Sequence, residues 1–293
     1  MLSHHIQIND HPFHYLGWGD RNDPVILMLH GFPEYSGAWA EVAEDLSRDH
    51  HCVAPDQRGY GQSWAPEDVN AYRTGKLVGD MVALIEHLGS RPVMVFGHDW
   101  GAAVAYALAI SRPDLVSHLI IANGVHPAPF QRALAAGGAQ TAASQYIHWL
   151  RREGSEEQLA EDDFAKLSSL FGASMDMGWM TPERRAAYLE EWRRPGRMRG
   201  MVNWYRASPL RLGQPGEVIT DLPEMPTHTL RVRMPHLLIW GERDTALLPE
   251  ATEGLEDYCD NLTRVTIPNA DHWILHQESH RVAAEVRTWL KRL

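Results

Sequence analysis

Cysteine is scarce in this chain of 293 residues, which holds only Cys52 and Cys259, far apart in the sequence. Two such cysteines make no disulfide framework, so we expect two buried thiols in a reducing compartment. A long apolar run is also lacking, because the longest one has about the length of one buried helix and is too short to span a bilayer. The polar N-terminus lacks the charged-then-apolar order of a signal peptide. These absences favour a cytoplasmic protein that does not enter a membrane.

Basic residues are outnumbered, with 27 Lys and Arg against 38 Asp and Glu and a formal net charge of −11. We see no basic stripe, which argues against nucleic acid as a partner. The spaced histidines of "HPFH" (11–14) and "HQESH" (276–280) have no carboxylates or cysteines in register, so we expect no metal. A Gly-rich phosphate loop is not evident either, and we expect no cofactor.

Short β-like runs alternate with helical patterns over the first part of the chain. The two opening runs, "HHIQI" and "FHYLGW", predict an antiparallel pair. Strands that alternate with helices imply βαβ units and a parallel sheet. The predicted elements that follow the opening pair are strands at 25–31, 51–56, 92–96 and 116–123, a helix at 77–89, and a helix after the strand at 92–96.

The alternation stops at Asn123. From about His126 to His228 the pattern is helical and rich in tryptophan and methionine, and Gly/Pro-rich stretches flank it. Strands resume at 235–244 and 262–272, and a helix at 280–293 closes the chain. We therefore expect one α/β core, residues 1–125 and 229–293, interrupted by a helical cap at residues 126–228.

The pentapeptide Gly97-His98-Asp99-Trp100-Gly101 lies between a predicted strand and a predicted helix. It has the shape of the nucleophile elbow G-x-S-x-G, with aspartate in place of serine. The two glycines allow strand and helix to approach closely around a strained residue. The plain alternative is a βα turn whose aspartate caps its helix.

Two later side chains favour the catalytic interpretation. Asp244 and His272 fall at the carboxyl ends of predicted parallel strands, where open α/β sheets place their sites. The order nucleophile, acid, histidine is that of α/β-hydrolases. Glu242 is a rival to Asp244, and so is Asp271, although adjacent residues on a strand end point apart.

The loop "HGFPE" (30–34) directly follows the strand predicted at 25–31. A backbone N–H group from Phe32 can join that of Trp100 to form an oxyanion hole. The plain alternative here is a Gly/Pro turn.

These motifs together resemble the epoxide hydrolases of the α/β-hydrolase superfamily. The segments "HGFPE", "DQRGYGQS" (56–63), "GHDWG", "NWYR" (203–206) and the "GERD…DHW" pair match that family in order and spacing over nearly the whole chain. The resemblance implies an α/β-hydrolase fold: a mostly parallel eight-stranded sheet with helices on both faces and an inserted helical cap. It also implies a cis peptide between Phe32 and Pro33 and two cap tyrosines that act as donors, Tyr146 and Tyr205.

An aspartate at the elbow suits attack on an alkyl carbon. Asp99 would form an alkyl ester, and water deprotonated by His272 would then attack the ester carbonyl. Asp244 would orient His272. An epoxide leaves as an alkoxide and needs a proton donor, which a phenol with a pKa of about 10 supplies without being ionised at rest.

We therefore expect an epoxide hydrolase acting on a small apolar epoxide and water. The sequence does not decide the oligomeric state and is compatible with a homodimer. The side chains expected to line the substrate pocket are His30, Phe32, Pro33, Trp100, Trp149 and Trp204.

Two other functions stay open. A haloalkane dehalogenase would use the same Asp99, His272 and Asp244, but such enzymes hold the halide with indole or amide N–H groups, often from an Asn in the HG-x-P loop. This chain has Phe32 there, and its cap offers tyrosines. A non-catalytic binding protein is the third alternative, because this fold also serves as a partner scaffold.

Overall fold

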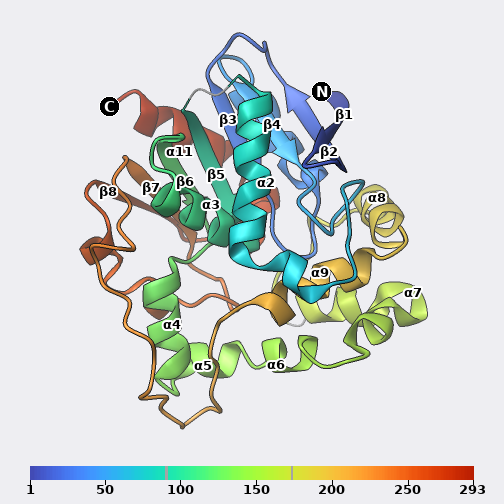
Figure 1. Ribbon diagram of the computed structural model, residues 1–293, viewed down its shortest axis with the longest axis vertical. Coiled ribbons are helices and arrows are strands. Elements are labelled where there is room, and N and C mark those ends of the chain that lie inside the picture. Colours follow the sequence, from blue (N-terminus) through green and yellow to red (C-terminus); the bar gives the residue numbers. More distant parts are fainter. Residues whose placement is uncertain (90–91, 173) are drawn as a thin grey trace.

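The computed structural model describes residues 1–89, 92–172 and 174–293, and its eight strands form one sheet (Figure 1). The strand order is β1-β2-β4-β3-β5-β6-β7-β8. Strand β2 pairs antiparallel with β1 and with β4, and the remaining pairs are parallel. The strands are β1 (Leu2–Ile8), β2 (His11–Trp18), β3 (Val25–Leu29), β4 (His51–Pro55), β5 (Val93–His98), β6 (Val116–Ala122), β7 (His236–Gly241) and β8 (Leu262–Ile267). The antiparallel opening pair and the mostly parallel sheet are confirmed.

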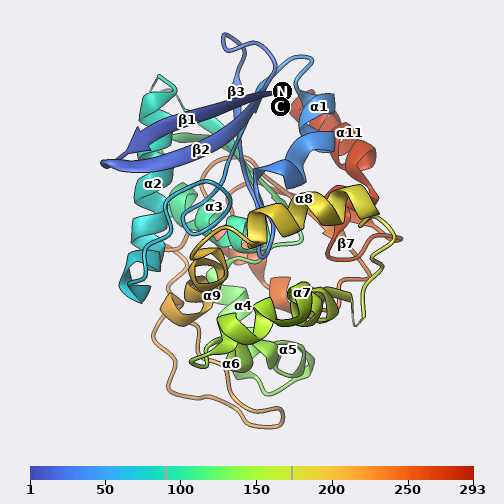
Figure 2. The ribbon, with the colours of Figure 1, turned by 90° about the vertical axis from the view of Figure 1, so that its right-hand side faces the viewer.

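Helices cover both faces of this sheet, as Figure 2 shows, with α2 and α3 on one side and α1 and α11 on the other. Helix α11 buries Val282, Val286 and Trp289, whose spacing places them on one helical face. These residues pack with α1 in one apolar cluster, and α2 and α3 belong to a second cluster on the opposite face. The core helices are α1 (Ala40–Leu46), α2 (Thr74–His87), α3 (Trp100–Ser111), α10 (Ile274–Gln277) and α11 (Ser279–Leu290), with short 3-10 helices η1 (Ser36–Trp39), η2 (Val69–Tyr72), η3 (Pro249–Thr252) and η4 (Leu255–Tyr258).

Helices α4 to α9 are inserted between β6 and β7, and in Figure 1 they lie at the bottom and at the right-hand side of the molecule. Helix α7 is interrupted by non-helical backbone at 161–164. The inserted helices are α4 (Pro127–Ala135), α5 (Ala139–Ala143), α6 (Tyr146–Leu150), α7 (Ser155–Gly172), α8 (Pro182–Trp192) and α9 (Arg197–Ala207). The cap boundaries at 125/126 and 228/229 remain our proposal.

The expectation of helix up to His228 is wrong beyond Ala207, because residues 208–228 contain no helix. Four prolines in this segment remove backbone donors and restrict the residues before them, which prevents a continuous helix. They are Pro209, Pro215, Pro223 and Pro226.

Three smaller expectations can also be compared with the structure. Both cysteines are buried and neither forms a disulfide. The Phe32-Pro33 peptide bond is cis, as the family resemblance implied. Within the described ranges, every helix is too short or too polar to cross a bilayer.

Candidate active site

Asp99 occupies the sharp turn between β5 and α3. Its backbone angles, φ 50° and ψ −122°, are strained for a residue that has a side chain. Two glycines make room for this turn, one in α3 and one in the loop after β3. A Cβ atom on Gly101 would lie 2.0 Å from the carbonyl oxygen of Leu29, and one on Gly31 would lie 2.3 Å from Cβ of Asp99. The turn therefore has the geometry of a nucleophile elbow.

The carboxylate of Asp99 has two different neighbours. The backbone N–H group of Phe32 donates to Oδ1 at 2.7 Å. The other oxygen, Oδ2, lies 3.6 Å from Nε2 of His272. One oxygen is thus held by the loop after β3, and the other faces the histidine. The second expected N–H donor, from Trp100, stays a prediction.

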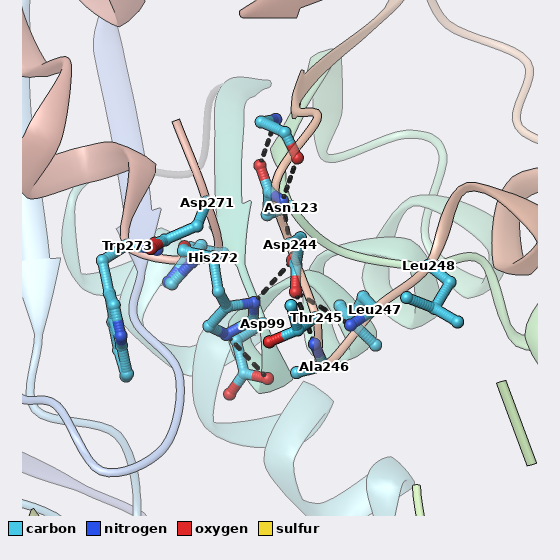
Figure 3. Close-up of polar contacts among 12 residues, drawn as sticks. Asp99, Asn123, Asp244, Thr245, Ala246, Leu247, Leu248, Asp271, His272 and Trp273 are labelled. Atoms are coloured by element: carbon cyan, nitrogen blue, oxygen red, sulfur yellow. Dashed lines mark hydrogen bonds and ion pairs between the residues drawn. The ribbon is translucent and has the colours of Figure 1, made fainter. Parts of the chain in front are cut away.

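His272 and Asp244 lie in loops beyond β8 and β7, because these strands end at Ile267 and Gly241, earlier than the sequence pattern suggested. Nδ1 of His272 lies 2.8 Å from Oδ2 of Asp244 (Figure 3). The imidazole therefore lies between two carboxylates, that of Asp244 and that of Asp99.

The two rival acids lie elsewhere. Asp271 uses its carboxylate to accept backbone N–H groups from Trp273 and Asp176. Glu242 is exposed. The choice of Asp244 over both rivals matches the observed hydrogen bonds.

The charges of this site stabilise one another. Burial disfavours the charged imidazole of His272, but Asp244 and Asp99 together outweigh it and raise its pKa to about 9. Burial also disfavours the charged carboxylate of Asp244, but His272 and the donated hydrogen bonds leave its pKa below the ordinary value. At neutral pH the free protein thus holds an imidazolium between two carboxylates.

Two cavities, of about 150 and 140 Å³, meet at Asp99. Both are lined by Asp99, Tyr146 and Tyr205, so the two tyrosines of the inserted helices face the same space as the carboxylate. Burial and the nearby Asp99 charge raise the pKa of Tyr146. Burial, then Tyr146 and Asp99, raise the pKa of Tyr205. Both phenols therefore keep their protons at neutral pH.

A family model for the alpha/beta hydrolase fold matches residues 24–279. The chain belongs to this family. It is 33% identical to the AB hydrolase superfamily protein YfhM of Bacillus subtilis (strain 168), over 98% of this chain and 96% of that protein. It is 32% identical to epoxide hydrolase 4 of Homo sapiens, over 95% of this chain and 75% of that protein. A solved structure described as novel epoxide hydrolases from metagenomes of hot environments has a TM-score of 0.90 at 34% identity, covering 99% of this chain and 98% of that one. The chain is therefore an epoxide hydrolase-like α/β hydrolase.

Two of the six side chains predicted to line the pocket do so in this hydrolase. Phe32 lines the first cavity and Trp100 the second. The other residues of the first cavity are Ala143, Leu170, Ser174, Met175, Thr245, Ala246, His272 and Trp273. The second is mostly apolar, with Thr74, Ala103, Ala107, Val125, Pro127, Phe130, Ile147, Ser208, Pro209, Leu210 and Leu247.

The other four predicted pocket residues, His30, Pro33, Trp149 and Trp204, are not among the described residues that line these cavities, and each has another role. His30 is fully buried and accepts a backbone N–H group through Nε2. The Trp204 indole donates to a backbone carbonyl group, and the Pro33 carbonyl group accepts from an indole. The Trp149 ring lies 4.4 Å from the ammonium group of a lysine. Burial and aromaticity alone could not separate a packing role from a lining role.

Asn123 is a site residue that sequence reasoning missed. Its side chain donates to Oδ2 of Asp244 at 2.7 Å and accepts the N–H group of Gly241 at 2.7 Å (Figure 3). The N–H groups of Ala246 and Leu247 donate to the other carboxylate oxygen. The available signal was a polar residue directly after the apolar strand β6.

Sequence reasoning also missed Glu34, a buried glutamate that is linked to the backbone of His272 through His98. Glu34 Oε2 lies 3.2 Å from Nδ1 of His98, whose Nε2 donates to the carbonyl oxygen of His272 at 2.8 Å. Glu34 Oε1 lies 2.6 Å from Nε2 of His276 and accepts from the hydroxyl of Tyr188 in the inserted helix α8. Burial opposes the charge of Glu34, but bonds to His276 and His98 lower its pKa. This group supports the backbone of His272.

In the part of the chain that the structure describes, no three His, Cys, Asp or Glu side chains are grouped so as to hold an ion.

Proposed function

We propose that this α/β hydrolase opens a small apolar epoxide to a vicinal diol through an alkyl ester of Asp99. The observation that carries the proposal is the shared lining of the two cavities, in which a strained carboxylate, the half-buried Tyr146 and the buried Tyr205 face one space. A carboxylate can attack an alkyl carbon, and a phenol can donate to the oxygen that leaves. We assign no role to a cofactor.

In the first step, Oδ2 of Asp99 attacks one epoxide carbon and the bond from that carbon to the ring oxygen breaks. The oxygen takes a proton from Tyr146 or Tyr205, whose raised pKa values keep both phenols protonated. The carboxylate becomes a neutral alkyl ester. Its carbonyl oxygen is Oδ1, which already accepts the N–H group of Phe32.

In the second step, His272, which has released its proton to solvent after alkylation, takes a proton from water, and the resulting hydroxide attacks the ester carbonyl carbon. The negative charge develops on Oδ1, next to the N–H group of Phe32 and, as we propose, that of Trp100. Collapse of this intermediate breaks the bond to the ester oxygen, and the leaving alkoxide takes a proton from the imidazolium to give the diol. The other proton of the attacking water passes from the Asp99 carboxyl group through solvent to the tyrosinate, which restores both Asp99 and the tyrosine. Asp244 stabilises the imidazolium that forms.

Alkylation also prepares the base. The Asp99 charge is one cause of the raised pKa of His272. Ester formation removes that charge, so the pKa of His272 falls and the imidazolium loses its proton more readily. The first step thus favours the second.

Trapping the ester tests the proposal. In His272→Gln the base is lost, so the ester should accumulate after incubation with styrene oxide, and intact and peptide masses should show one full epoxide mass on the Asp99 peptide. His280→Gln is a matched control, because that side chain is exposed and outside the site.

The outcomes separate the alternatives. An adduct from a bromoalkane but none from styrene oxide would favour a haloalkane dehalogenase. If neither styrene oxide nor an octyl-substituted terminal epoxide gives an adduct or a diol, epoxide hydrolysis is excluded for these two classes and a non-catalytic role is favoured.

A further inference from the structure

The carboxylate of Asp271 hydrogen-bonds across His272, the proposed base, to the residue that follows it. Its Oδ1 accepts the N–H group of Trp273 at 2.9 Å, so the bond closes a tight turn around His272 (Figure 3). On the other side of that residue, His98 donates to the carbonyl oxygen of His272. Asp271 is 5% exposed and its side chain does not bond the imidazole. The carboxylate therefore fixes the backbone from which the imidazole projects.

The second oxygen of the same carboxylate holds the cap. Oδ2 of Asp271 accepts the N–H group of Asp176 at 2.7 Å, and Asp176 lies in the loop between α7 and α8. The carbonyl oxygen of Asp176 accepts from Nε2 of Gln277 at 3.1 Å, and Oε1 of Gln277 accepts the N–H group of Asp271 at 2.8 Å. Asp271, Asp176 and Gln277 thus form a closed ring of hydrogen bonds between core and cap.

This cap loop lines the first cavity through Ser174 and Met175. It has another anchor in the core, because the hydroxyl of Ser174 lies 2.8 Å from that of Thr245, the residue after Asp244. Both anchors of the loop are therefore direct sequence neighbours of triad residues. A movement of the loop would act on the backbone at His272 through one carboxylate.

We propose that Asp271 is a positioning residue, which couples closure of the 174–176 loop over the cavity to the orientation of His272 for ester hydrolysis. The inference rests on the proposed function for its chemical consequence. In the closed state both oxygens are occupied, and the imidazole is held toward Asp99. When the loop opens, the Asp176 bond breaks and only the Trp273 bond remains.

Three variants weaken the link to the loop and leave the turn to Trp273 in place. In Asp271→Asn, the carbonyl oxygen can still accept the N–H group of Trp273, so the N–H group of Asp176 loses its acceptor and faces an amide NH2 group. In Asp271→Ser, the hydroxyl can still close the turn to Trp273 but is too short to replace both carboxylate oxygens. Gln277→Leu removes the bond to the Asp176 carbonyl group and leaves the carboxylate in place. Asp68→Asn is the matched control, because Asp68 is exposed, lines neither cavity and accepts the N–H group of Asn70 in a similar turn.

Rapid-quench mass spectrometry with styrene oxide measures the two chemical steps separately. In Asp271→Asn we expect alkylation of Asp99 at the wild-type rate, hydrolysis of the ester slower by roughly ten- to a hundredfold, and accumulation of the alkyl-protein. Asp271→Ser should slow ester hydrolysis by a similar factor, because its hydroxyl keeps the turn to Trp273 and does not hold the N–H group of Asp176. A merely structural role would slow both steps together, or lower the melting temperature without changing the ratio of the two rates.

Amide hydrogen exchange of the substrate-free protein gives a readout that does not depend on turnover. Segment 174–177 should exchange faster in Asp271→Asn, Asp271→Ser and Gln277→Leu, whereas the Trp273 amide should exchange at the wild-type rate in all three, because each variant keeps an acceptor for it. Failure of wild type to turn over any epoxide would defeat the proposed function and leave this test of the link intact. Wild-type hydrolysis in Asp271→Asn, or unchanged exchange in all three variants, would overturn the positioning role. If Asp271→Asn does not fold, Asp271→Ser and Gln277→Leu decide by exchange and by their rate ratios.

Discussion

At the scale of single residues, the site is an arrangement of charges that changes during the proposed reaction. Asp99, His272 and Asp244 form a row in which the imidazolium lies between two carboxylates. Conversion of Asp99 into an ester removes one of the two negative charges. The protonation of His272 therefore depends on the state of its neighbour.

An amide at position 99 mimics the neutral ester. In Asp99→Asn we expect the pKa of His272 to lie below the value of about 9 found beside the charged carboxylate. Nuclear magnetic resonance titration of the His272 ring in both proteins measures the difference. A pKa equal in the two proteins would contradict the charge coupling. In wild type, the rate of ester hydrolysis should correspondingly rise with pH through an apparent pKa below 9.

Removal of Tyr205 or Tyr146 should slow the alkylation of Asp99 by an epoxide and leave its alkylation by a haloalkane unchanged. Tyr205→Phe removes one donor while Tyr146 remains, so we expect alkylation by styrene oxide to slow by about tenfold or more, and the double Phe variant to lose about a hundredfold or more. Alkylation by a bromoalkane should stay near the wild-type rate in both. Tyr15→Phe on β2 is the control. A halide reaction slowed as much as the epoxide reaction would argue against proton donation.

At the scale of elements, the site depends on how closely β3, β5 and α3 pack. Gly101 is the second residue of α3 and lies directly against the backbone of Leu29 at the end of β3. The elbow can hold Asp99 at positive φ because the surrounding strands and helix leave no room for relaxation. Small residues at these contacts are thus part of the catalytic geometry.

Gly101→Ala should damage both stability and geometry. The new Cβ atom would lie 2.0 Å from the Leu29 carbonyl oxygen, so the strand and the helix must separate. We expect a loss of roughly 1–3 kcal/mol or more in unfolding free energy, measured by urea unfolding, together with slower alkylation. Gly79→Ala in the middle of α2 is the matched control, because no atom lies within 4 Å of its added Cβ. It should stabilise the protein by about 0.5–1 kcal/mol. Equal effects of the two substitutions would contradict the packing argument.

At the scale of the whole molecule, buried carboxylates tie separate parts of the core together. Asp56 lies 2.7 Å from Nδ1 of His14 on β2 and accepts the backbone N–H groups of Ser36 and Gln62. Burial opposes its charge, but these partners lower its pKa to about 2 from an ordinary 3.8. A carboxyl group with a lowered folded-state pKa stabilises the fold above its ordinary pKa, and this contribution is lost as the pH falls through the folded value.

Acid should therefore unfold the wild type more steeply than a variant without this charge. The shift of Asp56 corresponds to about 2 kcal/mol at neutral pH. In Asp56→Asn we expect at least that loss of unfolding free energy at pH 7, and a shallower fall between about pH 4 and pH 2. Urea unfolding over a pH series measures both quantities, with Asp68→Asn as the exposed control. A parallel pH dependence in wild type and Asp56→Asn would contradict the assignment.

Much of the architecture was determined by local sequence patterns. Alternating strands and helices predict the parallel sheet, and the order of Asp99, Asp244 and His272 predicts their meeting at one edge, because the carboxyl ends of parallel strands lie together. The elbow is partly local, because Gly97 lies against the backbone of Ala102, whereas Gly101 lies against Leu29 of a distant strand. The local features follow from backbone sterics and hydrophobic periodicity, which depend only on near neighbours in the chain.

The tertiary structure alone decided the rest. It directed the carboxylate of Asp271 to the N–H group of Asp176 and not to the imidazole, and it turned Trp204 and Trp149 toward packing contacts. It also brought Asn123 to Asp244, and linked Glu34 to the backbone of His272 through His98. Each of these outcomes depends on which distant segment fills the remaining space and hydrogen-bonding capacity of a buried group. Such pairings join residues up to 242 positions apart, as Glu34 and His276 show, and no local pattern encodes them.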